Sequence, residues 1–244
     1  MNKLINIIFY STFSILFLYS IFIFNVDYNV DKITLKKDNQ TIVLQGMIHV
    51  APEKFYNKVI QDKKEYEKNN YNSYYELIKS TNENKNNTHI KPNIKKIINR
   101  TGWQNETSIA EINNSTNLDI SLEEFENLLN IYGLTNRLIS PLNSLKNQGF
   151  IKGEESFIDK ITIPKTLYYA YLKHNWLTVN QLVNKSEFYN DIIIKYRNQN
   201  VVNHLVNNKK NSYVTYGNKH IKGIVNQLVN NGYSIEKQEK IFVF

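Results

Sequence analysis

Two copies of one short pattern constrain this chain most strongly: an apolar segment runs into a glycine, and a histidine follows three residues later. Residues 41–49 hold the first copy, with Gly46 and His49, and residues 212–220 hold the second, with Gly217 and His220. A helical pattern follows each copy. Glycine lets the backbone turn and lets other groups approach it closely. Each copy therefore predicts a strand, a turn that carries a histidine, and a helix.

The rest of the chain predicts further strands and helices around these two units. In the first part of the chain, we expect a hairpin from residues 32–35 and 41–44 around Asp38-Asn39, a helix from Pro52 to about Lys68 and a strand over 74–78. In the middle, we expect a helix over 93–100, a helix capped by Ser121 and ending near Tyr132, and a helix that opens at Pro164. In the last part, we expect a helix from Ser186 to about Val206, a helix that ends at Gly232 and a final strand near 241–244. This order predicts an α/β fold. Its central mixed sheet would be built from two strand–Gly-x-x-His–helix halves, with a helical insertion between them.

The N-terminus is a separate segment. Residues 4–24 are almost wholly apolar, and about twenty residues are needed for a helix to cross a bilayer. The end of this segment is bulky, which favours an uncleaved anchor over a cleaved signal peptide with small residues before its cut site. We therefore expect a single-pass transmembrane signal anchor over residues 1–25 and one domain over residues 26–244. Lys3 favours an N-terminus inside the cell and a main domain outside the cytoplasm.

Composition excludes some classes of function. The net charge is +8, but the lysines are scattered and no basic block is interleaved with aromatic residues. We therefore expect no nucleic-acid partner. The chain has no cysteine, which excludes disulfides, a thiolate nucleophile and cysteine metal sites.

Four side chains are candidates for a functional site. In an α/β sheet, ligands bind at the carboxyl ends of the strands, where His49 and His220 are expected to lie. Glu76 is a carboxylate in or at the end of an apolar strand, and such a position is costly unless the charge is paired or bound. Arg197 is one of only three arginines, and its planar group can bind a carboxylate with two hydrogen bonds.

These residues are compatible with more than one chemistry. His49, Glu76 and His220 suit a divalent metal such as Zn²⁺, Mn²⁺ or Fe²⁺, which would lower the pKa of a bound water. Without a metal, the histidines could act as general base and acid. Arg197 could stabilise an oxyanion or clamp a carboxylate. Alternatively, it could form a salt bridge to Glu76 that only holds a helix on the sheet.

Several segments, taken in order, resemble the TraB/PrgY/GumN group, the pheromone-shutdown-like family that includes the Tiki proteases. No single motif is specific, but the resemblance covers most of residues 41–235. The segments that carry it are Gly46-Met47-Ile48-His49-Val50 with Phe55-Tyr56 and Val59, Tyr75-Glu76, Thr101-Gly102-Trp103-Gln104, Asn117 to Phe125, Tyr196-Arg197-Asn198, and Tyr216-Gly217-Asn218-Lys219-His220 with Gly223 and Gly232-Tyr233. The chain departs from the family at Leu77, where many relatives carry glycine, and at Asn218 and Lys219, and these differences bear on substrate preference and activity.

The resemblance implies a two-half α/β fold whose site contains both Gly-x-x-His motifs, Glu76 and Arg197. For some members it implies a peptidase that depends on a divalent metal such as Mn²⁺, Co²⁺ or Zn²⁺, whereas pheromone-shutdown members are thought to block or sequester a peptide signal. We therefore consider a membrane-anchored hydrolase of peptide or acyl bonds and, as the alternative, a protein that binds a peptide or small ligand without turnover. A third interpretation, in which both histidines are structural, predicts that His49 and His220 lie far apart.

Overall fold

The computed structural model describes residues 28–78, 104–106, 109, 112, 114–131 and 194–243. The predicted anchor over residues 1–25, the predicted helices over 93–100 and from Pro164, and residues 186–193 lie outside this part. Within the described part, no helix has the length and apolar character needed to cross a membrane.

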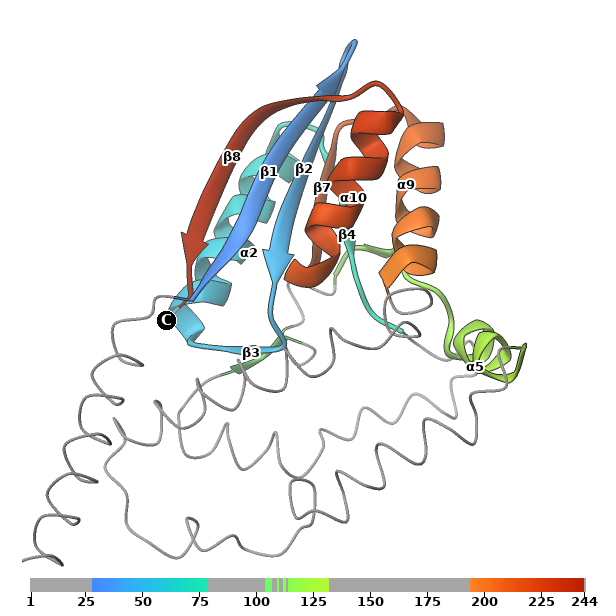
Figure 1. The fold of residues 1–244 in the computed structure, drawn as a ribbon. Coiled ribbons are helices and arrows are strands. Elements are labelled where there is room, and N and C mark those ends of the chain that lie inside the picture. The colour runs from blue at the N-terminus through green and yellow to red at the C-terminus, as the bar shows by residue number, and fades with distance from the viewer. Residues whose placement is uncertain are drawn as a thin grey trace, which may run out of the picture.

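A six-stranded mixed sheet forms the centre of the described structure (Figure 1). Its order is β6 (Thr116–Asn117), β4 (Asn72–Tyr75), β7 (Ser212–Gly217), β2 (Gln40–Met47), β1 (Asn29–Lys37) and β8 (Ser234–Phe242). β6, β4, β7 and β2 run parallel to one another, and β1 is antiparallel to both β2 and β8. The expected mixed α/β class is therefore confirmed.

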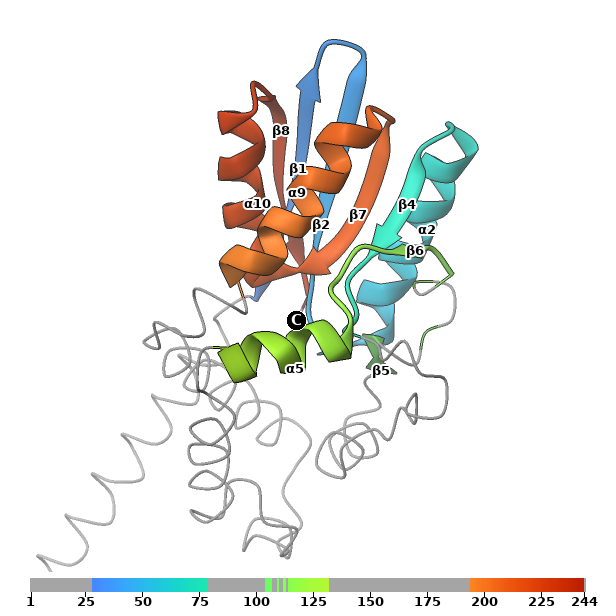
Figure 2. The ribbon, with the colours of Figure 1, turned by 90° about the vertical axis from the view of Figure 1, so that its right-hand side faces the viewer.

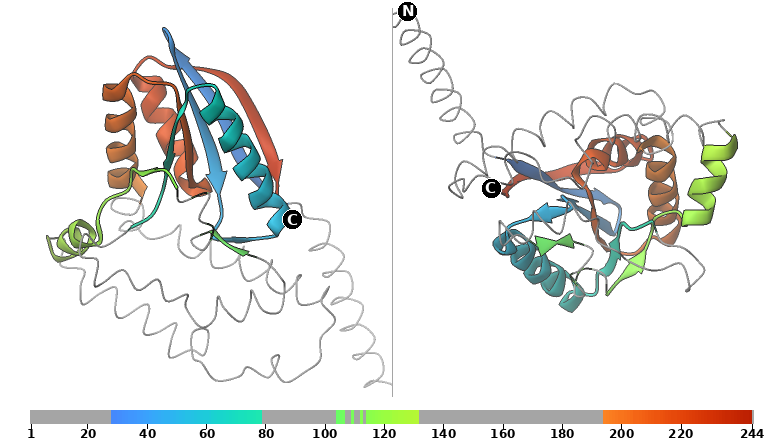
Figure 3. Two further views of the ribbon diagram at one scale, coloured as in Figure 1. Left: turned by 180° about the vertical axis from the view of Figure 1, so that it is seen from behind. Right: turned by 90° about the horizontal axis from the view of Figure 1, so that it is seen from below.

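Helices cover both faces of this sheet (Figure 3). α9 (Arg197–Asn208) and α10 (Asn218–Asn230) lie on one face, and α2 (Glu53–Lys68) lies on the other. Beyond the carboxyl ends of the parallel strands, β3 (Val50–Ala51) pairs with β5 (Gln104–Asn105), and α5 (Leu122–Ile131) follows β6 (Figure 2).

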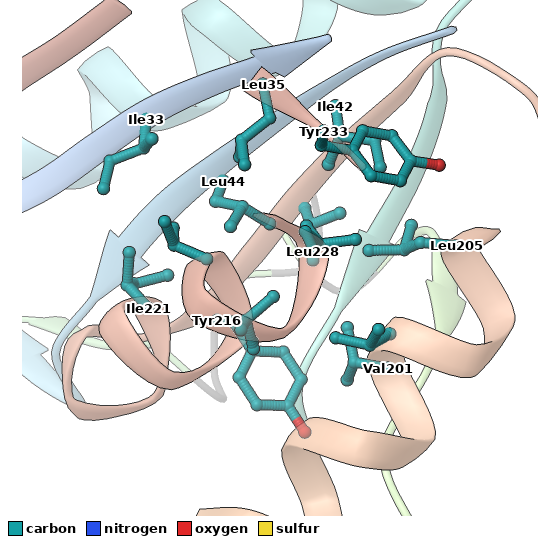
Figure 4. Close-up of a cluster of buried hydrophobic side chains, with 14 of the residues drawn as sticks. Ile33, Leu35, Ile42, Leu44, Val201, Leu205, Tyr216, Ile221, Leu228 and Tyr233 are labelled. Atoms are coloured by element: carbon teal, nitrogen blue, oxygen red, sulfur yellow. The ribbon is translucent and has the colours of Figure 1, made fainter. Parts of the chain in front are cut away.

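The two helical layers explain why β2 is buried along nearly its whole length. Ile42 and Leu44 pack in the cluster under α9 and α10, together with Val201, Ile221 and Leu228 (Figure 4). Met47 belongs to the second cluster, under α2, with Phe55, Tyr56 and Val59. A strand between two helical layers is apolar on both faces, as expected for the parallel part of an α/β sheet.

Local sequence signals account for several element boundaries. Asp38 adopts a positive φ of 50° in the predicted hairpin turn, and Gly232 has a φ of 89° just after α10. The Ser121 hydroxyl accepts the N–H of Glu124 at 3.0 Å, as the predicted cap requires.

Two strand predictions were wrong in extent. β4 spans Asn72–Tyr75 and not 74–78, because the Asn117 side chain bonds both the N–H and the C=O of Leu77 after the strand ends. β8 begins at Ser234, well before the predicted 241–244. Its residues are mostly exposed, so no apolar alternation marks it in the sequence.

Candidate functional site

The pairing of β2 with β7 brings the two Gly-x-x-His turns side by side. The strands are parallel, with Gly46 opposite Tyr216 and Met47 opposite Gly217. β4 lies on the other side of β7 and also runs parallel to it. His49, His220 and Glu76 therefore all follow the carboxyl ends of adjacent parallel strands, where α/β sheets bind ligands.

Arg197, the first residue of α9, is buried between two carboxylates. Its Nε donates to Asp119 Oδ1 at 2.7 Å, and its second terminal nitrogen donates to Asp119 Oδ2 at 2.5 Å and also to Glu76 Oε1. The side chains of all three residues are at most 10% exposed. The salt bridge between Arg197 and Glu76, one of the alternatives considered from the sequence, is thus present. Together with the bonds to Asp119, it connects α9 to the ends of β4 and β6.

His220 lies in the first turn of α10, and a neighbouring amide fixes its orientation. Its Nδ1 is 2.7 Å from Asn198 Oδ1, while Asn198 Nδ2 faces the His220 backbone carbonyl at 3.4 Å. A carbonyl can only accept, so the amide oxygen must point to the ring and accept a proton from Nδ1. The neutral ring then carries its lone pair on Nε2.

This Nε2 faces the two charged groups of the cluster. It lies 3.4 Å from the Nη1 nitrogen of Arg197 and 3.5 Å from Glu76 Oε1. The ring of Tyr216 packs edge-on against the imidazole, with centroids 4.9 Å apart. Burial lowers the pKa of His220 to about 4, so the imidazole is neutral near pH 7.

Both carboxylate oxygens of Glu76 accept hydrogen bonds. Oε1 accepts from Arg197, and Oε2 accepts the N–H of Gly217 at the start of α10. A β-carbon on Gly217 would lie only 2.9 Å from Oε2, which is why a glycine is needed there. Burial alone would raise the pKa of Glu76, but His220, Arg197 and this N–H outweigh burial and lower it. The carboxylate is therefore ionised near neutral pH.

Gly46, the other motif glycine, makes room for a link between the first and second units. A β-carbon there would lie 2.3 Å from Asn218 Oδ1, the atom that accepts the N–H of Asp31 at 2.8 Å. The glycine therefore lets the start of α10 attach to β1.

His49 has a different setting. Its side chain is 66% exposed, and its Nδ1 lies 3.3 Å from Oε2 of Glu106, a buried carboxylate. The N–H of Glu106 also donates to the His49 backbone carbonyl at 3.0 Å. The hydrogen bond to Glu106 raises the pKa of His49, whereas burial raises that of Glu106. The charge of Glu76 also raises the pKa of His49, and the charge of Arg197 lowers it.

The structure thus brings three of the four predicted side chains, Glu76, Arg197 and His220, into direct contact. His49 lies on the adjacent turn and is paired with Glu106. Sequence reasoning did not assign roles to Asp119, Asn198 or Glu106. For Asn198, the available signal in the sequence was its position next to Arg197. For Asp119, it was a carboxylate just after the short strand β6.

The predicted divalent metal can be compared with this arrangement. Glu76 Oε1 and His220 Nε2, 3.5 Å apart, are close enough to bind the same ion. Both Glu76 oxygens already accept hydrogen bonds, and His49 is bonded to Glu106. Over the described ranges, no group of three or more His, Asp or Glu side chains is arranged to hold a metal. The metal stays a prediction.

Comparison with known proteins adds no relative: no protein-family model, no curated protein and no solved structure matches the chain.

Proposed function

We propose that this chain is a membrane-anchored hydrolase that cleaves a peptide or another acyl bond outside the cytoplasm, as its resemblance to the TraB/PrgY/GumN and Tiki group implies. The observation that carries the proposal is the neutral, oriented imidazole of His220 beside Glu76 and Arg197. The two halves of the fold are then β2 with α2 and β7 with α10, each of which contributes a histidine.

In this proposal, His220 is the general base. Its Nε2 lone pair takes a proton from water as the water oxygen attacks the acyl carbon. The imidazolium that forms is stabilised by the ionised Glu76, whose Oε1 is 3.5 Å away. The Nη1 group of Arg197 also lies beside His220 Nε2. It stabilises the negative charge that develops on the carbonyl oxygen of the substrate.

His49 is the corresponding acid. Glu106 holds its Nδ1 and favours the protonated ring, while most of the side chain stays open to solvent. A proton from this ring goes to the leaving nitrogen or oxygen as the acyl bond breaks. The pKa values of the two histidines are shifted in opposite directions, as paired acid and base groups require.

If a divalent metal such as Mn²⁺, Co²⁺ or Zn²⁺ binds, Glu76 and His220 would hold it together with His49. It would supply a more acidic bound water. His49 and His220 would then act as ligands through their neutral rings, and not as acid and base.

Hydrolysis by the purified full-length chain tests the proposal. Peptides and esters are offered with Mn²⁺, Co²⁺ or Zn²⁺ and with a chelator, and His220→Ala is expected to lower the rate by about 10²- to 10⁴-fold. His204→Ala is the matched control, because His204 is an exposed histidine on α9. Full activity of the His220→Ala variant would refute the assignment.

One observation favours a ligand-binding function without turnover. The positive charge of Arg197 is neutralised by Glu76 and Asp119 together, which leaves it less available to a transition state. A binder would show metal-independent affinity for a peptide or small ligand that is recovered unchanged. Equilibrium binding followed by mass analysis of the recovered ligand distinguishes the two functions.

A further inference from the structure

β8 is an edge strand with an open outer side. It is the last strand in the sheet order, and β1 is its neighbour on the inner side (Figure 1). In the part of the chain that the structure describes, no strand pairs with its outer side. Nearly all of its side chains are exposed or partly exposed, and Ile241 is the buried one. A strand of this kind offers free N–H and C=O groups to another strand.

The sequence of β8 is complementary to itself when it is reversed. Residues 235–241 read Ile-Glu-Lys-Gln-Glu-Lys-Ile, with Gln238 at the centre. If a second copy of β8 pairs antiparallel with Gln238 opposite its own copy, Lys237 of each copy lies opposite Glu239 of the other. Lys237 and Glu239, the charged residues on either side of the centre, then each face an opposite charge. Such cross-strand pairs stabilise a sheet, whereas like charges directly opposite destabilise it.

No adjacent register has this property. In an antiparallel pair, two residues can face each other only if their backbone hydrogen-bonding groups point in the same direction. A change of register therefore places another whole residue at the centre. A centre at Lys237 places that lysine opposite its own copy, and a centre at Glu239 does the same for the glutamate. The charges of β8 therefore favour the register centred on Gln238.

Exposed apolar side chains lie at both ends of the same strand. Ile235 is 47% exposed and Phe242 is 58% exposed. A bulge on β8 lies at Glu236, because Thr34 pairs with Lys237 and Leu35 with Ile235. The regular part of the strand thus begins at Lys237 and contains the centre.

Existing ion pairs are compatible with this arrangement. Lys237 and Glu239 now bond each other along the strand at 3.0 Å. In a pair of strands they would exchange partners, and no charge would lose its counterion. Lys240 and Glu236 pair with Asp31 and Lys36 of the inner strand β1, at 2.6 Å and 3.5 Å, and keep these partners.

We propose that two copies of this chain associate through β8, in antiparallel pairing with Gln238 on the two-fold axis. The two six-stranded sheets join into one continuous sheet. Since β8 lies at the opposite edge of the sheet from β4 and β6, this contact leaves the cluster of Glu76, Arg197 and His220 uncovered.

Cysteine cross-linking of the full-length chain tests the register, because the native sequence has no cysteine. Gln238→Cys places two sulfurs across the axis and is expected to form a disulfide-linked dimer under mild oxidation. Lys237→Cys and Glu239→Cys are matched controls on the same strand. Each lies diagonal to its own copy, at about 7–8 Å, which is beyond the reach of a relaxed disulfide. Equal cross-linking of all three variants, or of none, would overturn the proposal.

Charge reversal tests the interface without a covalent bond. Lys237→Glu places two like-charge pairs across the axis, and the dissociation constant measured by sedimentation equilibrium in detergent is expected to rise about tenfold. Adding Glu239→Lys restores complementarity and should restore the dimer. A monomer at every concentration, or a dimer that Lys237→Glu leaves unchanged, contradicts pairing through β8. The second result would place self-association elsewhere on the chain.

Discussion

His220 and Asn198 hold each other in one orientation at the centre of the candidate site. The ring Nδ1 lies 2.7 Å from the amide oxygen, and the amide nitrogen faces the backbone carbonyl of the same histidine. Gly223 allows this contact, because a β-carbon there would lie 2.2 Å from Asn198 Nδ2. A single asparagine thus determines which ring nitrogen of His220 carries the proton.

Asn198→Ala should allow the neutral ring of His220 to carry its proton on either nitrogen. We expect the wild-type ring to be protonated on Nδ1, and the variant to gain a population protonated on Nε2, since the acceptor at Nδ1 is lost. Two-bond ¹H–¹⁵N correlation spectra of the imidazole report the tautomer directly. Asn203→Ala is the matched control, because Asn203 is an exposed asparagine on the same helix. A wild-type ring protonated on Nε2 would show that our orientation of the amide is wrong.

Arg197→Met should destabilise the fold strongly. It leaves Glu76 and Asp119 buried without their counterion, and breaking a buried pair in this way costs about 3–5 kcal/mol. The denaturant dependence of unfolding gives this free energy. Lys36→Met is the control, because the pair between Lys36 and Glu236 is exposed and such pairs contribute about 0–1 kcal/mol.

A triple variant separates loss of charge balance from loss of packing. If Arg197→Met is combined with Glu76→Gln and Asp119→Asn, no charge is left unpaired in the cluster. We expect part of the lost stability to return. A triple variant less stable than Arg197→Met alone would mean that the guanidinium acts mainly through its shape.

Gly217→Ala should cost about 1–3 kcal/mol, the usual range for forcing extra atoms into a packed site. The reason is specific: the new methyl group would lie 2.9 Å from Glu76 Oε2, the oxygen that accepts the Gly217 N–H. The same substitution in a Glu76→Ala background should therefore cost less. Equal unfolding free-energy changes in the two backgrounds would assign the cost to the backbone instead.

His220 should make stability depend on pH in the acid range. Its folded pKa of about 4 lies below the ordinary value of 6.5, so the unfolded chain binds a proton more readily. The stabilisation is fully present above pH 6.5 and is lost as the pH falls from 6.5 towards 4, with a limit on the order of 3 kcal/mol. The difference in unfolding free energy between wild type and His220→Gln isolates this contribution. His204→Gln, at an exposed position on α9, is the matched control substitution.

The sequence was informative where local patterns control structure. Alternating apolar residues around Asp38 predicted the hairpin of β1 and β2, and Ser121 predicted the start of α5. The extent of β8 was missed because an exposed edge strand needs no apolar alternation. Glu76 was chosen as a candidate in or at the end of a predicted strand over 74–78, because a carboxylate in an apolar segment requires a partner.

The sequence by itself determined that the chain would form an α/β sheet and that two Gly-x-x-His turns would follow strands. Tertiary structure decided which side chains meet there. Parallel pairing of β2, β7 and β4 placed Glu76 beside His220, and the packing of α9 added Arg197 and Asn198 to them. It also separated the roles of two histidines that look alike in the sequence: burial makes His220 neutral, whereas Glu106 pairs with an exposed His49. Contacts between residues distant in the chain set these environments, because hydrogen bonds and charges act over a few ångströms in space.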